Sequence, residues 1–300
     1  MKRSYEDFIW ENIEYFKKIY LNRDEFFIPK GKDGSDKYYI SDSALQHWVE
    51  AIAQYYDPYN GDVAQLKKDL SESRRGQYSN GALYSSSRFV AELFTSKVNR
   101  NALLELLGIE GDATNFKWTL EYRLNISGLP RPAQMDLVVE NDEYFVGIEA
   151  KMKEIYASWD NNFSLAYENG ANHYLSEFNH FLKIDFSNPT LVGKRYVHRA
   201  SIDGYAKCNF YYKQQICHLL GMRQKQAEDK SPNKKYLFLN LVFDPRDIDP
   251  SECKAIEMYE ANEKAVSQIL KPHFDKTGIE YRGLLTQKDI LHHKRAPDCV

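Results

Sequence analysis

The stretch MDLVVENDEYFVGIEAK, residues 135–151, decides the fold that we expect for this chain. Residues 135–139 and 144–152 are rich in residues that favour strands, and the polar residues 140–143 separate these two runs. Two strand-forming runs joined by a short polar segment are typical of a β-hairpin. The stretch therefore predicts two antiparallel strands with a tight connection.

The hairpin is expected to have a charged face and an apolar face, because successive residues of a strand point to opposite sides. Asp136, Glu149 and Lys151 are expected together on the charged face. The apolar face is expected to hold Met135, Leu137, Val139, Val146, Ile148, Ala150 and Met152. This second face would pack against helices.

The position of the turn decides how closely Asp136 approaches Glu149. A turn at residues 141–142 would place Asp136 opposite Gly147 and diagonally from Glu149, whereas a turn at 142–143 would place the two acids directly opposite each other. Either register leaves the carboxylates within about 5–8 Å. A three-residue loop would shift the pairing by one residue, so that Asp136 and Glu149 would no longer share a face, unless a β-bulge restored the register. The sequence leaves both two-residue turns open.

The elements on both sides of the hairpin follow from hydrophobic periodicity. Before it, we expect helices near residues 5–20, 41–55 and 85–107, and a strand at 118–124. After it, we expect a helix at 210–222, a buried strand at 236–243, a helix at 252–270, and a strand and helix within 281–291. The spacing in the less regular residues 153–202 predicts a helix across 167–181.

This order of elements predicts an α/β fold with a mixed central β-sheet flanked by helices. We expect a mainly helical N-terminal region at residues 1–84. An α/β domain is expected at 85–300, with an insertion at about 153–202.

Two carboxylates and a lysine on one strand face have a definite chemical use. Carboxylate oxygens bind Mg²⁺ or Mn²⁺, and the cation offsets the repulsion between Asp136 and Glu149. A bound cation lowers the pKa of a water ligand and stabilises charge on a scissile phosphate. Lys151 could hold the attacking water or contact the phosphate as a point charge. The three residues together indicate hydrolysis of a phosphodiester.

In these residues the chain resembles the PD-(D/E)XK nuclease superfamily, which includes many restriction endonucleases. The resemblance rests on Asp136, twelve intervening residues and Glu149-Ala150-Lys151 in a hairpin, and it spans roughly residues 85–245. It implies a restriction endonuclease-like fold in which Asp136, Glu149 and the backbone carbonyl of Ala150 hold the metal and Lys151 serves the water. Met135 departs from the pattern, because a proline usually precedes the first acid.

Two further matches to this superfamily are weaker. Glu92 resembles an acidic residue that many members place near the metal. Gln214 resembles a catalytic glutamine on the helix after the hairpin, but spacing alone does not decide whether Gln214 or Gln215 faces the site. We interpret His218, on the same expected helix, as a packed side chain rather than a catalytic base.

A local excess of positive charge predicts where nucleic acid could bind. The whole chain has a net charge of −3, which argues against binding by bulk attraction. Residues 190–235 nevertheless hold ten basic and only three acidic residues. The predicted contacts with a phosphate backbone are Lys194, Arg195, Arg199, Lys207 and Lys213. The alternative is an ordinary solvated face.

The cysteines and the hydropathy indicate the compartment. Cys208, Cys217, Cys253 and Cys299 form no C-x-x-C pair and do not resemble a disulfide framework. No stretch approaches the roughly 20 apolar residues that cross a bilayer. We therefore expect a cytoplasmic protein with reduced thiols and no membrane contact.

The function expected from this pattern is a Mg²⁺-dependent endonuclease that cleaves DNA, of restriction or defence type, with Mn²⁺ as a possible substitute. Cleavage of both strands would imply a homodimer. One alternative is a non-catalytic DNA-binding or partner-binding module that keeps the fold. Another is a nuclease for repair or RNA processing.

Overall fold

The computed structural model describes most of the chain from residue 42 to residue 293. The described ranges are 42–71, 85–156, 159–167, 175–178, 180–185, 187–192, 195–203, 207–231 and 233–293, with residues 12, 27–29, 38–40 and 205. The helix expected at residues 5–20 lies outside these ranges.

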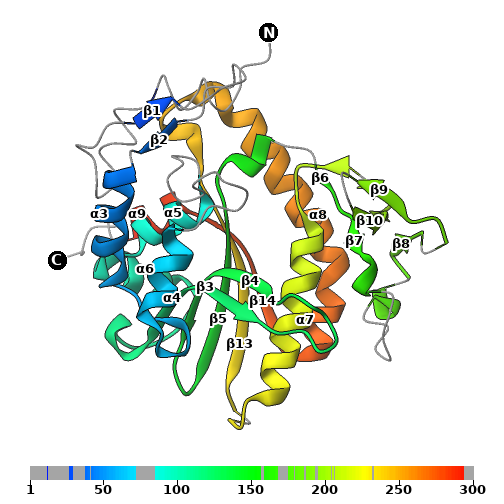
Figure 1. Ribbon diagram of the computed structural model, residues 1–300, viewed down its shortest axis with the longest axis horizontal. Helices are drawn as coiled ribbons and strands as arrows, with labels where there is room; N and C mark the ends of the chain where they lie inside the picture. Colours follow the sequence, from blue (N-terminus) through cyan, green and yellow to red (C-terminus); the bar gives the residue numbers. More distant parts are fainter. Residues whose placement is uncertain are drawn as a thin grey trace.

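A five-stranded mixed sheet forms the centre of the protein (Figure 1). The strand order is β14-β13-β5-β4-β3, where β3, β4 and β5 are antiparallel neighbours and β13 and β14 run parallel to β5. The strands are β3 (Lys117–Leu124), β4 (Ala133–Glu140), β5 (Tyr144–Lys151), β13 (Lys235–Val242) and β14 (Ile279–Thr286). The predicted α/β fold with a mixed central sheet is confirmed.

The hairpin of β4 and β5 has the second of the two predicted registers. Glu140 pairs with Phe145, and the backbone N–H of Asn141 donates to the carbonyl of Tyr144 at 3.0 Å, so residues 142–143 form the turn. The side-chain oxygen of Asn141 accepts hydrogen bonds from the N–H groups of residues 143 and 144, which fixes the turn. Continuing this register past the pair Leu137–Ile148 brings Asp136 opposite Glu149.

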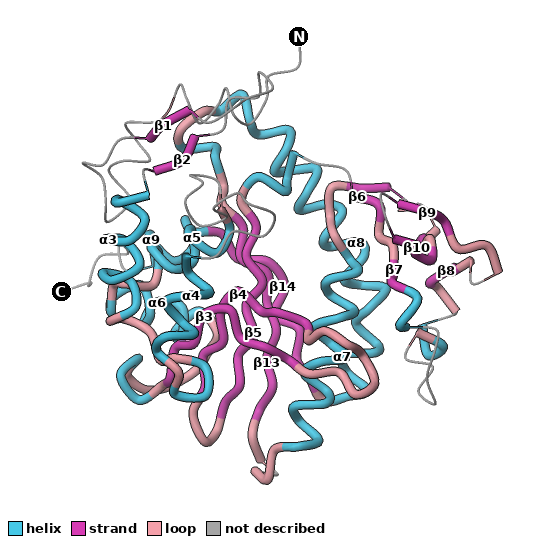
Figure 2. The backbone as a smooth tube through the Cα atoms, viewed as in Figure 1, coloured by secondary structure: helices cyan, strands magenta, loops and turns pink. Residues whose placement is uncertain are grey.

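Helices cover both faces of the sheet, as the tube in Figure 2 shows. One face carries α3 (Asp42–Ala53), α4 (Val63–Ser71), α5 (Ser86–Leu93), α6 (Lys97–Leu106) and α9 (Gln287–His292). The other carries α7 (Tyr212–Glu228) and α8 (Cys253–Thr277). The 3-10 helices are η1 (Tyr59–Gly61), η2 (Ala113–Asn115), η3 (Lys153–Tyr156), η4 (Leu165–Tyr167), η5 (Ser176–Phe178), η6 (Pro245–Asp247) and η7 (Pro250–Glu252).

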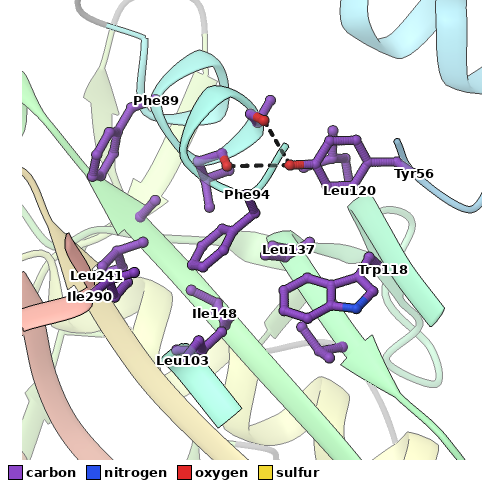
Figure 3. Packing of buried hydrophobic residues seen from close by; sticks show 14 of the residues in the cluster. Tyr56, Phe89, Phe94, Leu103, Trp118, Leu120, Leu137, Ile148, Leu241 and Ile290 are labelled. Atoms are coloured by element: carbon purple, nitrogen blue, oxygen red, sulfur yellow. Dashed lines mark hydrogen bonds between the residues drawn. The ribbon is translucent and has the colours of Figure 1, made fainter. Parts of the chain in front are cut away.

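The helices before the hairpin share a core with the sheet (Figure 3). Trp48 of α3 and Phe94 after α5 are fully buried in the same cluster as Leu137 and Ile148. The Tyr56 hydroxyl donates to the carbonyl of Ala91 at 2.7 Å, which ties the end of α3 to α5. The N-terminal part is mainly helical as predicted, with the addition of a short hairpin of β1 (Phe27–Pro29) and β2 (Tyr38–Ile40).

The insertion is built from short strands rather than from the helix expected at 167–181. In its described part, only η5 and a turn occupy residues 175–181, and residues 168–174 lie outside the description. Leu175, Phe178 and Leu182 are buried at spacings that a helix would also satisfy, which explains the wrong prediction. The strands are β6 (Trp159–Asp160), β7 (Phe163–Ser164), β8 (Leu182–Ile184), β9 (Thr190–Val192), β10 (Arg195–His198), β11 (Ala200–Ile202) and β12 (Lys207–Cys208).

Figure 1 places this group of short strands beside α7 and α8, on the side away from α3. The hydroxyl of Tyr212 in α7 donates to the carbonyl of Ala200 at 3.2 Å, and Arg223 forms an ion pair with Glu177. Among the helices that the structure describes, none combines the length and hydropathy that a bilayer crossing requires.

Close packing of α7 on the sheet gives a first testable prediction. A Cβ added at Gly221 would lie 2.6 Å from Cβ of Leu124, an atom fixed by the backbone of β3. We expect Gly221→Ala to lower the free energy of unfolding by about 1–3 kcal/mol, measured by chemical denaturation, despite the higher helix propensity of alanine.

Gly147→Ala serves as the matched control for this prediction. Its added Cβ would meet Cε of Met135 at 2.7 Å, and that atom is the end of a flexible side chain that can move. A smaller loss is expected there. A loss at Gly221 no greater than at Gly147 would contradict the close approach of α7 to β3.

Candidate functional site

The candidate site lies where β4 separates from β5. Leu137 still pairs with Ile148 of β5, but Met135 pairs with Tyr122 of β3. Between these positions, the Asp136 carboxylate accepts a hydrogen bond from the backbone N–H of Ala150 at 2.7 Å. A side chain thus takes the place of a backbone acceptor at the fork between the two strands.

Two further hydrogen bonds define the geometry around the fork. The hydroxyl of Ser87, at the start of α5, donates to the other oxygen of Asp136 at 3.3 Å. On the opposite edge of β5, the Lys151 carbonyl accepts from the N–H of Phe243 at 2.9 Å. Because the N–H and carbonyl of one strand residue point to the same edge, the Ala150 carbonyl faces the fork beside Asp136.

Glu149 and Lys151 form a buried ion pair next to this fork. These two residues are only 3% and 6% exposed. One oxygen of Glu149 accepts from the Lys151 ammonium, and the other lies 2.8 Å from Nε2 of His218, on α7. Asp136, by contrast, is half-buried.

The local electrostatics shift the pKa values of Asp136 and Glu149 in opposite directions. Loss of water around Asp136 and the nearby charge of Glu149 raise the pKa of Asp136 well above its usual value, against the opposing effect of Lys151. Burial would also raise the pKa of Glu149, but Lys151 and His218 outweigh it and lower that pKa to about 2. Without a cation, Glu149 is therefore ionised at neutral pH and Asp136 resists ionisation.

Lys151 keeps its charge in this surrounding. Burial alone would lower its pKa, but the carboxylates of Glu149, Asp136 and Glu154 raise it above the usual value. Glu154 also accepts a hydrogen bond from the backbone N–H of Met152 at 2.9 Å. The ammonium is thus a permanent positive charge between three acidic side chains.

The alternation of faces breaks at Asp136, which corrects one expectation. Met135 does not share the face of Leu137 and Val139, because it packs in the cluster under α7 while they pack in the cluster under α5. The same break occurs opposite, in β3, where Glu121 has a backbone φ of +51° and pairing is interrupted. The left-handed backbone at Glu121 thus coincides with a change of face in both strands.

The strained backbone at Glu121 gives a second prediction. A left-handed conformation costs a residue with a Cβ about 1–2 kcal/mol, so Glu121→Gly should be more stable than Glu121→Ala by about 1 kcal/mol. Both variants lose the same carboxylate, which isolates the backbone effect. At Arg123, with an ordinary strand φ, glycine should instead be the less stable replacement. Denaturant unfolding of the four variants measures this, and the same order at both positions would contradict the strain.

Glu121 also adds a third acid near Asp136. Its carboxylate contributes to the raised pKa of Asp136, and it accepts a hydrogen bond from the Gln134 amide at 2.6 Å. In the part of the chain that the structure describes, no three His, Cys, Asp or Glu side chains are arranged as a complete metal cage. The carboxylates of Asp136 and Glu149 and the Ala150 carbonyl are nevertheless the hard oxygen donors that suit Mg²⁺, which keeps several water ligands.

Glu92, one of the two weaker matches to the superfamily, contacts residues of α3 and α5. The Glu92 carboxylate accepts a hydrogen bond from the Trp48 indole at 2.5 Å and lies 3.6 Å from the Arg88 guanidinium. Ser87, one turn earlier on α5, is the residue of this helix that contacts Asp136. These contacts place the Glu92 carboxylate against Trp48 of α3.

Of the two glutamines, Gln215 rather than Gln214 faces the sheet. Gln215 is buried, and its amide donates to the Asn240 side chain at 2.7 Å. Asn240 pairs with Glu149 across β13 and β5 and donates in turn to the Tyr281 hydroxyl at 2.7 Å. Gln214 is half-buried on a neighbouring side of α7.

The contact of His218 with Glu149 was not predicted from the sequence, although the side chain is buried as expected. A signal was present in the spacing: Gln215 and His218 are polar residues one turn apart on the otherwise apolar face of α7. Polar groups in such positions need buried partners.

The predicted nucleic-acid contacts are spread over the insertion and the start of α7. Arg199 is exposed between β10 and β11. Lys213 lies in the first turn of α7, with its ammonium 5.8 Å from the ring centre of Phe163. Arg195 is in β10 and Lys207 in β12, where only the backbone is described, and Lys194 lies outside the described residues.

Comparison of the chain with protein-family models, with curated proteins and with solved structures gave no significant match.

Proposed function

We propose that this protein is a divalent-metal-dependent nuclease that hydrolyses phosphodiester bonds in DNA. The observation that carries the proposal is the fork of β4 and β5, where Asp136 stands opposite Glu149 and Lys151 is paired with Glu149. A buried lysine between carboxylates on adjacent strands costs desolvation free energy that a purely structural face would avoid. The same residues carry the resemblance to the PD-(D/E)XK superfamily.

Each residue has a separate task in this proposal. Asp136, Glu149 and the Ala150 carbonyl would hold Mg²⁺ or Mn²⁺, which when bound polarises the phosphate and lowers the pKa of a water ligand. Lys151 keeps its proton and donates to the attacking water or to a non-bridging phosphate oxygen. Asp136 is half-buried, so we propose that the phosphate group approaches the site from its side.

The charge around the site supports DNA as the substrate. Arg199 and Lys213 offer positive side chains on the side of the insertion, which suits a phosphate backbone. We propose a restriction or defence role in the cytoplasm. A homodimer would allow cleavage of both strands. The restriction endonuclease-like fold is part of the same proposal.

Cleavage by the purified protein tests the function. Supercoiled plasmid, linear duplex, single-stranded DNA and RNA would be incubated with Mg²⁺, Mn²⁺ or EDTA, and binding of Mn²⁺ would be measured by calorimetry in parallel. We expect Mn²⁺ binding and metal-dependent cleavage of duplex DNA. RNA as the preferred substrate would indicate RNA processing. A protein that neither binds Mn²⁺ nor cleaves any substrate would instead be a module that only keeps the fold.

A further inference from the structure

His218 contacts a site residue but has no assigned role. It projects from α7 onto β5, is 2% exposed, and its Nε2 lies 2.8 Å from an oxygen of Glu149. Because an ionised carboxylate only accepts, the ring nitrogen donates this hydrogen bond. His218 is thus a buried donor aimed at one oxygen of Glu149.

The second ring nitrogen of His218 indicates that the hydrogen bond to Glu149 is the reason for a polar residue at this position. Nδ1 of His218 is buried and forms no hydrogen bond within the described part of the chain. Leaving such an atom unpaired costs about 1–3 kcal/mol, a cost that an apolar residue of similar size would not carry. The ring packs with its centre 5.8 Å from that of Phe238, a site that leucine could also fill. The histidine is therefore explained by what it does to Glu149.

The helix that carries His218 is held closely against the sheet. A Cβ at Gly221 would meet Leu124 of β3 at 2.6 Å, and a Cβ at Gly147 of β5 would lie 3.3 Å from the sulfur of Met222. These approaches leave α7 no room to move toward β3 and β5. With Lys151 on one oxygen and His218 on the other, the Glu149 carboxylate is held in one orientation.

We propose that His218 is a positioning residue, which orients Glu149 for the cation of the site. This inference rests on the proposed metal-dependent function. A carboxylate has lone pairs enough to accept from both donors and still bind a metal. Loss of such an outer hydrogen-bond partner typically costs 10–100-fold in metal affinity. The effect of His218 should therefore appear in metal binding before it appears in stability.

Two substitutions separate positioning from packing. His218→Leu keeps the volume and removes the donor, whereas His218→Gln keeps an N–H donor at a similar reach. For Leu we expect the Mn²⁺ concentration at half-maximal cleavage, and the calorimetric Kd, to rise about 10–100-fold. For His218→Gln, both quantities should stay within about threefold of their wild-type values. In both variants, kcat at saturating Mn²⁺ should change less than the Mn²⁺ concentration at half-maximal cleavage. His292→Leu, at an exposed position on α9, is the control.

Other outcomes decide against the proposal or against the function. Equal Mn²⁺ requirements in wild type and His218→Leu would overturn the positioning role, as would an effect of Gln as large as that of Leu. If the wild type binds no Mn²⁺ and cleaves nothing, the proposed function fails. In that case, additive effects of His218→Leu and Glu149→Gln on the free energy of unfolding would show that His218 does not act through Glu149.

Discussion

Asp136→Asn is expected to reduce metal-dependent cleavage at least about a thousandfold while stabilising the metal-free fold at neutral pH. The carboxylate lies opposite Glu149 at the fork, and its pKa is raised well above the usual value by loss of water and by that neighbouring charge. Asparagine removes the charge and keeps an acceptor for the Ala150 N–H. Activity and stability should therefore change in opposite directions.

The sign of the pH dependence follows from the raised pKa of Asp136. A carboxyl whose pKa is higher in the folded state favours folding when protonated, and this advantage is lost as pH rises above the ordinary value of 3.8 through the folded value. Asp136→Asn should thus melt at the wild-type temperature below about pH 3.8 and at a higher temperature at pH 7.

Added metal provides the control for this prediction. Saturating Mn²⁺ should raise the melting temperature of the wild type, because it binds the folded state, and should have little effect on Asp136→Asn. Asp142→Asn, in the hairpin turn, removes a carboxylate away from the fork and should match the wild type in cleavage. An active Asp136→Asn variant, or one destabilised at pH 7 without metal, would refute this account of the carboxylate.

Lys151→Met is expected to lose cleavage by about a hundred- to a thousandfold and, unlike Asp136→Asn, to lose stability. Lys151 is 6% exposed and its ammonium pairs with Glu149, so its removal leaves a buried carboxylate with His218 alone. Breaking a buried pair from one side costs about 3–5 kcal/mol, and the remaining His218 contact places the expected loss near the lower end. Denaturant unfolding and plasmid cleavage measure the two effects.

A second substitution shows whether the lost stability comes from Glu149. Lys151→Met combined with Glu149→Gln removes the unpaired charge, so it should recover most of the stability and none of the activity. The stability gap between wild type and Lys151→Met should be widest above pH 4.5 and should narrow as pH falls toward 2. The reason is that the depressed pKa of Glu149, about 2, stabilises the fold only where the carboxylate is ionised.

Lys254→Met, an exposed position on α8, is the control for loss of a surface lysine. Equal effects of the Lys151 and Lys254 substitutions on stability and cleavage would contradict the role of the buried pair. A double variant no more stable than Lys151→Met would show that the lost stability has another origin.

The hairpin could be predicted because its pattern is local. Strand-forming residues, a polar turn and alternation are all written within residues 135–151, and the turn at 142–143 was one of two registers that the sequence allowed. The strand predicted at 236–243 and observed at Lys235–Val242 was equally clear, since residues 236–242 are apolar except for Asn240 and are buried on both faces. Local pattern therefore yielded the mixed sheet and the hairpin register that brings Asp136 opposite Glu149.

The break in alternation at Asp136 could not be predicted, because its cause is elsewhere. The change of face at Met135 coincides with the left-handed backbone at Glu121, on a different strand. Glutamate rarely adopts this conformation, so no residue preference signals it. His218 was missed for a related reason: its contact with Glu149 depends on how α7 packs across β5, which periodicity does not give.

The small strands of the insertion were missed because they are two to four residues long and pair across gaps in the sequence. Their buried residues, such as Leu175 and Phe178, repeat at a spacing that also fits a helix. Likewise, Glu92 has the expected position on a helix before the first strand, but the packing of α5 against α3 turns it toward Trp48.

Anomalous diffraction from crystals grown with Mn²⁺ tests the central claim most directly, which is that Asp136 and Glu149 hold a divalent cation together. The account predicts a Mn²⁺ peak at the fork of β4 and β5, bound by oxygens of Asp136, Glu149 and the Ala150 carbonyl at roughly 2.0–2.2 Å. Crystals of Asp136→Asn should lose that peak. Saturating Mn²⁺ with an ordered Glu149–Lys151 pair and no peak at the fork would contradict the account.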